Sequence, residues 1–436
     1  MMVTVAALSG LPATSHHLRR ATFRLTFEAA EPKVPYICAP LSGTIAQLVE
    51  QRIENPCVPG SNPGGTTTKE AAAQRLFFAF LCSMKPLRQI AAFHSWPSDM
   101  DAVFWIHEEG LDDSCVEAYR QALQESTSAP LKIFVASGGE QMKSWDHLPT
   151  LLQAFSQHKL SRHSVVLTTG GGAMSDAVGF AASIWKRGMR VAHVPTSTLA
   201  MVDAAWGGKT AFNHDGKKNQ LGTFHAPLFV HIDACWLNTL PERHRRSGLA
   251  EVAKHAMLDP ILGWNHLKNW PDWSPTDQDV LRTWTERMKD SAEAKRRIVE
   301  EDPFETGRRA TLNLGHTIGH AVEAHFSATE APWLHGEAVA LGLRFAIFMA
   351  SESCSDDFQP LKDWLQRQVP LPSVKWPTAN ELWPIMKHDK KNRLGEVREV
   401  HWKGWGDVVW PEILEKDAFK ATWPAFLRSE MESPHL

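Results

Sequence analysis

The sequence predicts two domains: an α/β domain with a parallel sheet, followed by an all-α domain. Between about residues 84 and 240, apolar strand patterns alternate with helical patterns, and strands connected through helices form parallel sheets. After about Leu240 the strand patterns fade, and segments of helical periodicity follow one another. The length of 436 residues is sufficient for two such domains.

Residues 1–83 differ from the rest of the chain and are excluded from the fold prediction. Within them, GTIAQLVEQRIENPCVPGSNPGGTTTKE (43–70) is rich in Pro, Gly, Asn and Thr and has no sustained period. One interpretation is a disordered extension. The other is an artefactual segment, because one reading frame of a transfer-RNA T-arm encodes GSNP, and Gly43–Thr66 has roughly the length of such a gene. The second interpretation puts the natural start near Met84.

Four apolar segments of the α/β domain have the pattern of buried strands. They are VFWIHEEG (103–110), LKIFVASGG (131–139), HSVVLTTGGG (163–172) and MRVAHVPTS (189–197). The second and third end in glycines, which is typical of a tight turn after a strand. A helix is expected from Ser175 to about Lys186, between the third and fourth strands.

In the second domain, apolar residues recur at helical spacing in five segments. These predicted helices are 246–258, 278–300, 312–325, 334–352 and 360–368. Ligand sites occur preferentially at domain interfaces, so the cleft between the two domains is the expected site.

Composition and charge restrict the classes of ligand. A net charge of −3 excludes a general basic field for nucleic acid, so any anionic ligand must be held by local cations. The six cysteines form no C-x-x-C pair, which predicts a reducing, cytoplasmic environment and argues against a cysteine-based zinc site. No apolar run reaches the roughly 18 residues of a membrane helix, so no membrane partner is expected.

Two glycine-containing loops in the α/β domain suit an anionic ligand. Gly170-Gly171-Gly172 ends a strand and precedes a helix, where backbone N–H groups and the helix N-terminus favour a pyrophosphate. The segment 202–227 gathers lysines among glycines, a combination that suits phosphate groups. A tight turn and a solvated surface loop are the alternative interpretations, and together the two loops favour a dinucleotide.

Three helical segments offer ligands for a metal ion. RSGLAEVAKHAML offers Glu251, Lys254 and His255 on one helical face, TLNLGHTIGHAVEAH offers His316 and His320 four residues apart, and WLHGEAVALGL offers His335 and Glu337. One carboxylate and two imidazoles from three helices form an open zinc site of the catalytic kind. Spacing alone does not assign the histidines, and each of them could instead be a hydrogen-bonded core residue.

Six motifs, in order, make the chain similar to the 3-dehydroquinate synthases of the sugar-phosphate cyclase family. They are GGGAMSDAVGFAA, KRGMRVAHVPTSTLAMVDAAWGGKT, KNQLGTFHAP, SGLAEVAKHAMLD, RRATLNLGHTIGHAVE and LHGEAVALG. The resemblance extends from about 130 to 345 and, more weakly, to DKKN at 389–392. It implies a Rossmann-like NAD-binding domain at 84–240 and an all-α metal- and substrate-binding domain at 241–436.

The resemblance implies a cytoplasmic carbon–oxygen lyase of the shikimate pathway, which leads to the aromatic amino acids. Such an enzyme converts 3-deoxy-D-arabino-heptulosonate 7-phosphate to 3-dehydroquinate and phosphate. It uses and regenerates NAD within each turnover and requires a divalent metal, usually zinc or cobalt. Because members of the family are commonly dimers, a homodimer is expected.

The resemblance also assigns roles to individual positions. The implied metal ligands are Glu251, His316 and His335. The implied catalytic residues are Lys209, Lys254, Lys295, Arg309, Asn313 and His320. The implied cofactor contacts are Glu140, Lys143, Gly171, Gly172, Asp176, Thr196, Ser197, Lys218 and Asp203, of which Asp203 also matches a substrate-site position. The implied substrate contacts are Arg187, Asn219 and Lys390, and Glu305 matches an acid of a family motif.

The chain departs from the family pattern in three places. Ser175 in GGGAMSD replaces a usual glycine. The strand that usually ends in an aspartate for the adenosine ribose ends here with Glu108 and Glu109. The usual apolar strand after DKKN reads REVHWKGWG at 398–406.

Three other functions compete with this prediction. A sibling cyclase would act on sedoheptulose 7-phosphate, but the residues at the catalytic positions keep the dehydroquinate synthase pattern. A metal-dependent polyol dehydrogenase would release NADH and would not need the cluster of phosphate-binding cations. An inactive ligand-binding paralogue is disfavoured by the intact Glu251, His316 and His335 set.

Overall fold

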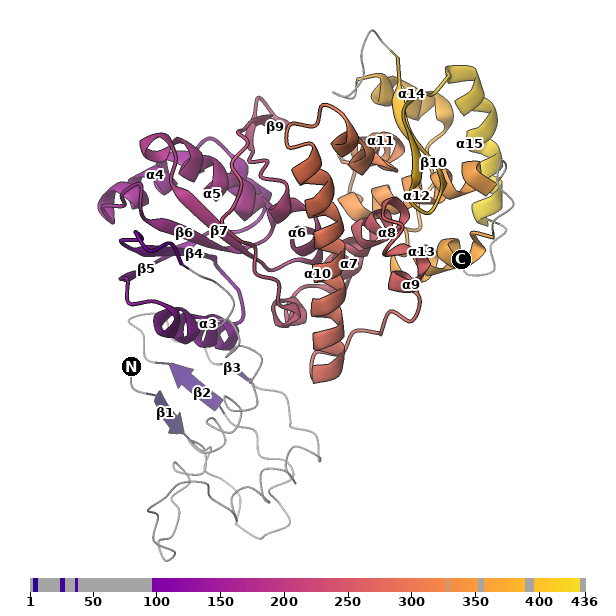
Figure 1. The fold of residues 1–436 in the computed structure, drawn as a ribbon. Helices are drawn as coiled ribbons and strands as arrows, with labels where there is room; N and C mark the ends of the chain where they lie inside the picture. The colour runs from indigo at the N-terminus through magenta and orange to yellow at the C-terminus, as the bar shows by residue number, and fades with distance from the viewer. Residues whose placement is uncertain are drawn as a thin grey trace, which may run out of the picture. The chain divides into compact units, whose positions relative to one another are not determined.

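The computed structural model describes residues 3–6, 24–27, 36–37, 96–327, 329–351, 357–388 and 396–431 (Figure 1). The chain divides into two units, Met1–Ile90 and Ala91–Leu436. The first unit contains an antiparallel sheet of three short strands, β1 (Val3–Ala6), β2 (Arg24–Phe27) and β3 (Tyr36–Ile37). The segment 43–70, to which the two interpretations of the sequence refer, lies outside the described residues.

A four-stranded parallel sheet is the centre of the α/β domain. Its strands are β4 (Val103–Glu108), β5 (Leu131–Ala136), β6 (Val165–Gly170) and β7 (Arg190–Pro195), in the order β5-β4-β6-β7. The connecting helices are α3 (Asp113–Ser126), α4 (His147–Gln157) and α5 (Gly172–Ile184). All six residues of β6 are buried because both faces of the sheet are covered there, which explains why apolar and exposed polar residues do not alternate along it. The four predicted strands and the α/β class are thereby confirmed.

Contacts between aromatic side chains hold the helices α3 and α4 against the sheet. On one face, Phe104 of β4 contacts Phe155 of α4 edge to face, within a cluster that also includes residues of α5. On the other, Trp105 contacts Tyr119 of α3, and Tyr119 contacts Trp236. Phe104, Trp105, Tyr119 and Phe155 are each at most 1% exposed, so α3 and α4 are anchored on opposite faces.

The remaining short elements of this domain follow the glycine-rich loops. They are η3 (Glu140–Lys143), η4 (Trp185–Arg187), α6 (Thr198–Val202), η5 (Ala204–Trp206), β8 (Phe212–His214), β9 (Lys217–Leu221) and η6 (Ala234–Asn238). The hairpin of β8 and β9 turns at Asp215 and Gly216, whose φ angles are 49° and 69°. An Asp-Gly pair with two positive φ angles is the preferred two-residue hairpin turn.

The rest of the second unit is mainly helical. Its helices are α7 (Glu242–Ser247), α8 (Leu249–Leu258), α9 (Gly263–Leu267), α10 (Gln278–Glu301), η7 (Arg308–Asn313), α11 (His316–Phe326), α12 (His335–Ser351), α13 (Gln359–Gln368), α14 (Ala379–Lys387) and α15 (Lys416–Met431). An antiparallel hairpin of β10 (Arg398–Gly404) and β11 (Asp407–Ile413) adds strand structure that the prediction of an all-α domain did not contain. None of the described helices is long and apolar enough to cross a bilayer.

Two boundaries in this domain differ from the prediction. The helix predicted over 246–258 is divided near Gly248 into α7 and α8. The helix predicted over 312–325 begins only at His316, because Gly315 has a φ of 76° and interrupts the chain between η7 and α11.

Candidate functional site

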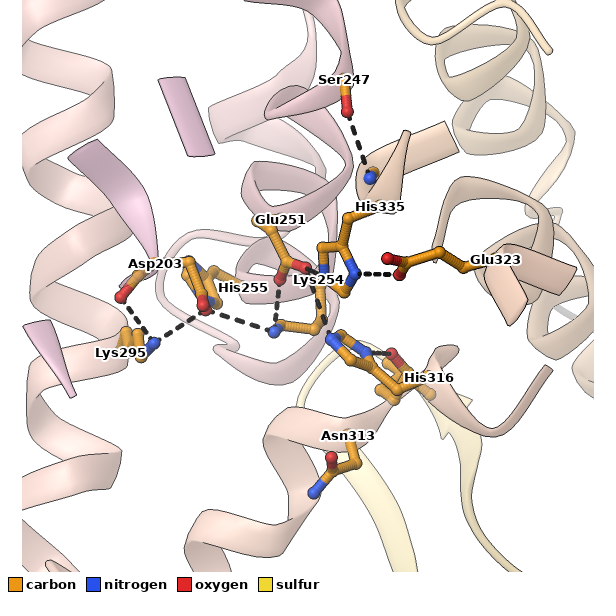
Figure 2. Close-up of polar contacts among 12 residues, drawn as sticks. Asp203, Ser247, Glu251, Lys254, His255, Lys295, Asn313, His316, Glu323 and His335 are labelled. Atoms are coloured by element: carbon orange, nitrogen blue, oxygen red, sulfur yellow. Dashed lines mark hydrogen bonds and ion pairs between the residues drawn. The ribbon is translucent and has the colours of Figure 1, made fainter. Parts of the chain in front are cut away.

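Three side chains from three helices converge beside the interdomain cleft (Figure 2). Glu251 comes from α8, and His316 and His335 are the first residues of α11 and α12. Glu251 Oε1 lies 3.3 Å from His335 Nε2 and 3.5 Å from His316 Nε2. One ligand atom from each residue lies within 4.8 Å of the others, which is close enough for a single metal ion.

Close helix contacts bring these residues together. A Cβ on Gly319 of α11 would lie 3.2 Å from the Ala338 carbonyl oxygen of α12. A Cβ on Gly336 of α12 would lie 1.9 Å from the Ser247 carbonyl oxygen of α7. Glycines at these two positions let α12 approach both α11 and α7, so His335 lies next to His316 and Glu251 (Figure 2).

The donor set fits a divalent cation such as Zn²⁺. Glu251 is fully buried, and neither of its carboxylate oxygens accepts a hydrogen bond from a described residue. Burial alone would raise the pKa of Glu251, but Lys254 and His316 hold it well below its usual value, so the carboxylate is ionised. Because His316 Nδ1 faces the Leu314 carbonyl oxygen at 3.0 Å, its Nε2 is left toward the metal position. One oxygen and two nitrogen ligands leave a coordination position for substrate.

His335 lies between two carboxylates. Its Nδ1 is 3.0 Å from Glu323 Oε2, and its Nε2 faces Glu251. Burial lowers the pKa of His335, but the neighbouring carboxylates of Glu251 and Glu323 outweigh this and raise it to about 10. Without a cation His335 is therefore protonated, and a bound cation would replace the proton on Nε2.

A second cluster joins the two domains beside the metal position. Lys295 Nζ of α10 lies 2.9 Å from Asp203 Oδ1 and donates a hydrogen bond of 2.7 Å to the Asp203 carbonyl oxygen. Lys254 Nζ lies 3.5 Å from Asp203 Oδ1 and also contacts Glu251 (Figure 2). Burial lowers the pKa of Lys295, whereas Glu251 and Asp203 outweigh burial and raise the pKa of Lys254. Asp203 thus pairs with residues of the helical domain.

A cavity of about 950 Å³ opens between the two domains. From the α/β domain it is lined by Asp176, Asp203, Lys209 and Asn219, and from the helical domain by Lys254, Lys295, Arg309, Asn313 and His316, among others. Cations outnumber acids among these predicted residues, which suits an anionic ligand despite the negative net charge of the chain.

Asp302 shapes one wall of the cavity. Its carboxylate accepts hydrogen bonds from the backbone N–H groups of Thr306, Gly307 and Arg309 at 2.9, 2.7 and 3.0 Å. The backbone hydrogen bonds lower its pKa to about 2, chiefly that from Thr306. The loop so formed presents Glu305 and Arg309 to the cavity.

Glu305 connects the two walls of the cavity. Its carboxylate contacts Lys209 of the α/β domain and accepts a hydrogen bond of 3.1 Å from Asn313 Nδ2. Arg309 Nη2 donates to the Gly207 carbonyl oxygen at 2.7 Å. The predicted catalytic residues Lys209 and Asn313 are therefore connected through Glu305 across the cavity.

Another group of predicted residues gathers at the carboxyl end of the sheet. Glu108 accepts hydrogen bonds from the N–H groups of Gly171 and Gly139 at 3.0 and 3.2 Å, so this acid, rather than Glu109, lies between the two glycine turns. Gly171 is the N-cap of α5. The substituted Ser175 is buried, and its hydroxyl points back to the Gly171 carbonyl oxygen at 3.4 Å, so it does not narrow the turn.

The other predicted cofactor contacts lie close by. Lys143 Nζ lies 2.8 Å from Asp176 Oδ2 and also donates to Asn219 Oδ1. Burial raises the pKa of Asp176, and Lys143 opposes that shift. Glu140 accepts a hydrogen bond from Asn213 at 2.9 Å.

Two further predicted residues follow β7. The Thr196 N–H donates to the Gly170 carbonyl oxygen at 2.9 Å, and Ser197 caps α6. Gly172, the first residue of α5, has the methyl group of Ala204 close to it.

Some predicted residues are not brought into the cavity. Arg187 is exposed beyond the carboxyl end of α5, where its φ is 66°. Lys218 is 62% exposed and pairs with Glu323 at 3.2 Å. Lys390 lies outside the described residues. The His320 ring is centred 5.2 Å from that of His316, beside the metal position.

The helix predicted over 312–325 would include Asn313, and this placement was wrong. Asn313 belongs to η7 and is separated from α11 by the left-handed Gly315. It still lines the cavity. Glu323 was missed, although it follows His316 by seven residues, a spacing that repeats the same helical face.

Comparisons with known proteins agree with this geometry. Family models for the N-terminal and C-terminal parts of 3-dehydroquinate synthase match residues 133–247 and 248–392. The chain is 39% identical over 307 residues to 3-dehydroquinate synthase of Prochlorococcus marinus (strain MIT 9303), covering 69% of this chain and 80% of the relative. It is 37% identical over 327 residues to 3-dehydroquinate synthase of Bordetella pertussis, covering 72% of this chain and 87% of the relative.

Solved structures share the fold. A 2-deoxy-scyllo-inosose synthase complexed with carbaglucose-6-phosphate, NAD⁺ and Co²⁺ is 22% identical with a TM-score of 0.64, over 77% of this chain and 94% of that one. The 2-epi-5-epi-valiolone synthase from Streptomyces hygroscopicus, with NAD⁺ and Zn²⁺ bound, is 22% identical with a TM-score of 0.64. The match covers 78% of this chain and 95% of that one.

Proposed function

Because the chain belongs to the 3-dehydroquinate synthase family, we propose that its interdomain cavity converts 3-deoxy-D-arabino-heptulosonate 7-phosphate to 3-dehydroquinate and phosphate. The family makes the chain a carbon–oxygen lyase of the shikimate pathway that uses NAD and a divalent metal, Zn²⁺ or Co²⁺. The observation that carries the proposal is the convergence of Glu251, His316 and His335 beside a cavity lined by cations.

The two cofactors have separate positions in this proposal. When bound, NAD supplies a reversible hydride acceptor and the cation supplies a Lewis acid for substrate hydroxyl groups. Glu251, His316 and His335 hold the cation. Gly171, Gly172 and the N-terminus of α5 accept the pyrophosphate, which the positive end of the helix dipole favours. Glu140, Lys143, Asp176, Thr196, Ser197 and Lys218 contribute the remaining cofactor contacts.

The cavity residues bind and orient the substrate. Lys209, Asn219 and Arg309 supply charge-assisted hydrogen bonds to the substrate phosphate. Lys209 would break its ion pair with Glu305 when it binds that phosphate. Lys254 and Lys295 are both buried; Lys254 contacts the proposed metal ligand Glu251, and Lys295 contacts Asp203. Their charges suit the carboxylate and hydroxyl groups of the substrate. Asp203 fixes both lysines, and Asn313 orients the substrate. His320, whose ring lies beside that of His316, bonds the substrate and helps proton transfer. Arg187 and Lys390 remain proposed substrate contacts.

A product assay tests the proposed function. The purified chain is incubated with the heptulosonate phosphate, a catalytic amount of NAD and Zn²⁺, and phosphate and 3-dehydroquinate are followed together. Stoichiometric formation of both supports the proposal. Consumption of sedoheptulose 7-phosphate with neither product would instead identify a sibling cyclase, and net NADH formation from a polyol would identify a dehydrogenase.

We further propose a cytoplasmic homodimer, on the resemblance to the family. Cys115 and Cys235 are free buried thiols, in keeping with a reducing environment. Light scattering of the purified chain tests the oligomeric state, and a mass of one chain at micromolar concentration would contradict the dimer.

A further inference from the structure

Glu323 has a position that neither the resemblance nor the sequence pattern assigned. It lies on α11, seven residues after His316, and its side chain is 23% exposed. Oε2 lies 3.0 Å from His335 Nδ1, and Oε1 lies 3.2 Å from Lys218 Nζ. Figure 2 shows its carboxylate on the side of the His335 ring opposite Glu251.

The two nitrogens of His335 are thereby given different tasks. A metal-binding imidazole uses one ring nitrogen as ligand and donates its other N–H to an acceptor, which fixes the tautomer and the ring orientation. Glu323 is the acceptor on Nδ1, so Nε2 is the nitrogen that faces Glu251 and the metal position. Among the described residues, His316 has the neutral Leu314 carbonyl oxygen for this purpose and no carboxylate. The carboxylate makes His335 the more basic ligand of the two.

The other oxygen of Glu323 connects the metal position to the α/β domain. Lys218 belongs to β9, in the hairpin of β8 and β9, and Glu323 belongs to α11 of the helical domain. Glu323 is more buried than Lys218, at 23% against 62% exposure, so the bond to the histidine is the better shielded of its two contacts.

We propose that Glu323 is a positioning residue that orients the metal ligand His335 through its contact with Nδ1. The proposal rests on the proposed function, since it requires a cation held by Glu251, His316 and His335.

Metal affinity, measured without turnover, tests the proposal. The full chain is freed of metal, and its affinities for Zn²⁺ and Co²⁺ are measured by competition with a chromophoric chelator. Glu323→Gln keeps the shape of the side chain but makes it a weaker hydrogen-bond acceptor for His335 Nδ1. We therefore expect the affinity for the metal to fall by about 10- to 100-fold, the range typical of acceptors that hold a metal-binding histidine. We also expect the visible absorption of bound Co²⁺ to change, because the orientation of one ligand changes.

Two variants serve as controls. Glu330→Gln removes the same charge from the exposed connection before α12, whereas the carboxylates that pair with His335 in the described part of the chain are Glu251 and Glu323. This variant is expected to stay within about twofold of the unmodified chain. Lys218→Met leaves the Glu323–His335 bond intact and is expected to stay within about threefold. A loss in Lys218→Met as large as that in Glu323→Gln would overturn the proposal, since the effect would then not pass through His335.

The remaining outcomes are also decisive. Unchanged affinity and unchanged Co²⁺ spectrum in Glu323→Gln would overturn the role of Glu323. If that variant does not fold by circular dichroism, Glu323→Asp replaces it: its shorter side chain withdraws the acceptor, and an affinity equal to that of the unmodified chain would overturn the proposal. Failure of the unmodified chain to bind either metal would instead refute the metal site of the proposed function.

Discussion

At Glu251, a buried carboxylate faces one lysine and two imidazoles, and its ionisation depends on all three. Glu251→Ala removes the single anionic ligand, so we expect the chain to lose bound metal and activity together. Metal content per chain and phosphate release, measured on the same preparation, check this prediction. Full metal content in the variant would contradict the assignment of Glu251.

His316 and His320 lie one turn apart on α11 and have different expected roles. His316→Ala removes a ligand and is expected to abolish both metal binding and activity. His320→Ala leaves the Glu251, His316 and His335 set intact, so it is expected to retain metal while turnover falls by about 10²-fold or more, the contribution typical of a proton-transfer group. Loss of metal in His320→Ala would make it a ligand instead.

Asp203 is the shared counter-ion of two buried lysines. Asp203→Asn leaves Lys254 and Lys295 without that charge, and breaking a buried ion pair from one side costs about 3–5 kcal/mol. Because Asp203 is 24% exposed and Glu251 still contacts Lys254, we expect the lower end of that range, together with loss of activity. Urea unfolding measures the first effect. The exposed turn variant Asp215→Asn is the control, expected to unfold as the unmodified chain does.

At the scale of the element, Gly315 decides where α11 begins. Its φ is +76°, and an added Cβ would lie 2.9 Å from Leu343 Cδ2 and 3.0 Å from the Leu343 backbone nitrogen. In Gly315→Ala, left-handed strain of about 1–2 kcal/mol and this overlap are expected to displace His316 and weaken metal binding. Chelator competition and urea unfolding measure the two effects.

The control for Gly315 separates strain from overlap. Gly110 has a φ of +80° with nothing within 4 Å of an added Cβ. Gly110→Ala should therefore lose stability through strain alone, with unchanged metal affinity. Equal metal affinities in both alanine variants would show that the contact of Gly315 with α12 does not place His316.

At the scale of the whole molecule, two buried histidines make stability depend on pH. Burial lowers the pKa values of His193 on β7 and His266 on α9 to about 4. The unfolded chain takes up these protons near pH 6.5, whereas the folded chain does not until about pH 4. Stability is therefore expected to fall as pH drops from about 6.5 to 4, by about 2 kcal/mol for each histidine at pH 5.

Urea unfolding at pH 7.5 and pH 5.0 checks this expectation. His266→Gln should show a smaller loss of stability between the two pH values than the unmodified chain. The exposed His244 on α7 offers a control, and His244→Gln should lose as much as the unmodified chain. An identical loss in all three proteins would rule out His266 as a source of the pH dependence.

The extent of the functional unit is a second question at this scale. All predicted cofactor, substrate and metal residues lie after Met84, and the second compact unit starts at Ala91. We therefore expect a chain that starts at Met84 to fold, bind Zn²⁺ and form 3-dehydroquinate as the full chain does. Circular dichroism and the product assay check this, and a shortened chain that fails to fold would show that residues 1–83 contribute to the protein.

Periodicity was sufficient for the elements that are regular over many residues. The four strands and α10 follow from their apolar residues. The inner strand β6 is buried at every residue and α10 is buried along one face, whereas Ile133 and Val135 of the edge strand β5 are exposed. Helix starts could not be predicted as well. The apolar spacing of 312–325 continues through Gly315, and only the contact with Leu343 of α12 shows why the helix begins at His316.

By itself, the sequence determined the α/β class, the order of the elements and, through the resemblance to a family, the set Glu251, His316 and His335. The tertiary structure alone decided which groups surround that set. Glu323 lies beside His335, and Asp203 beside Lys295, because helices distant in the chain pack together. The spacing of residues along the sequence predicts which of them share a face of one helix. Hydrogen bonds and ion pairs between two helices form only when the helices pack together in the tertiary structure.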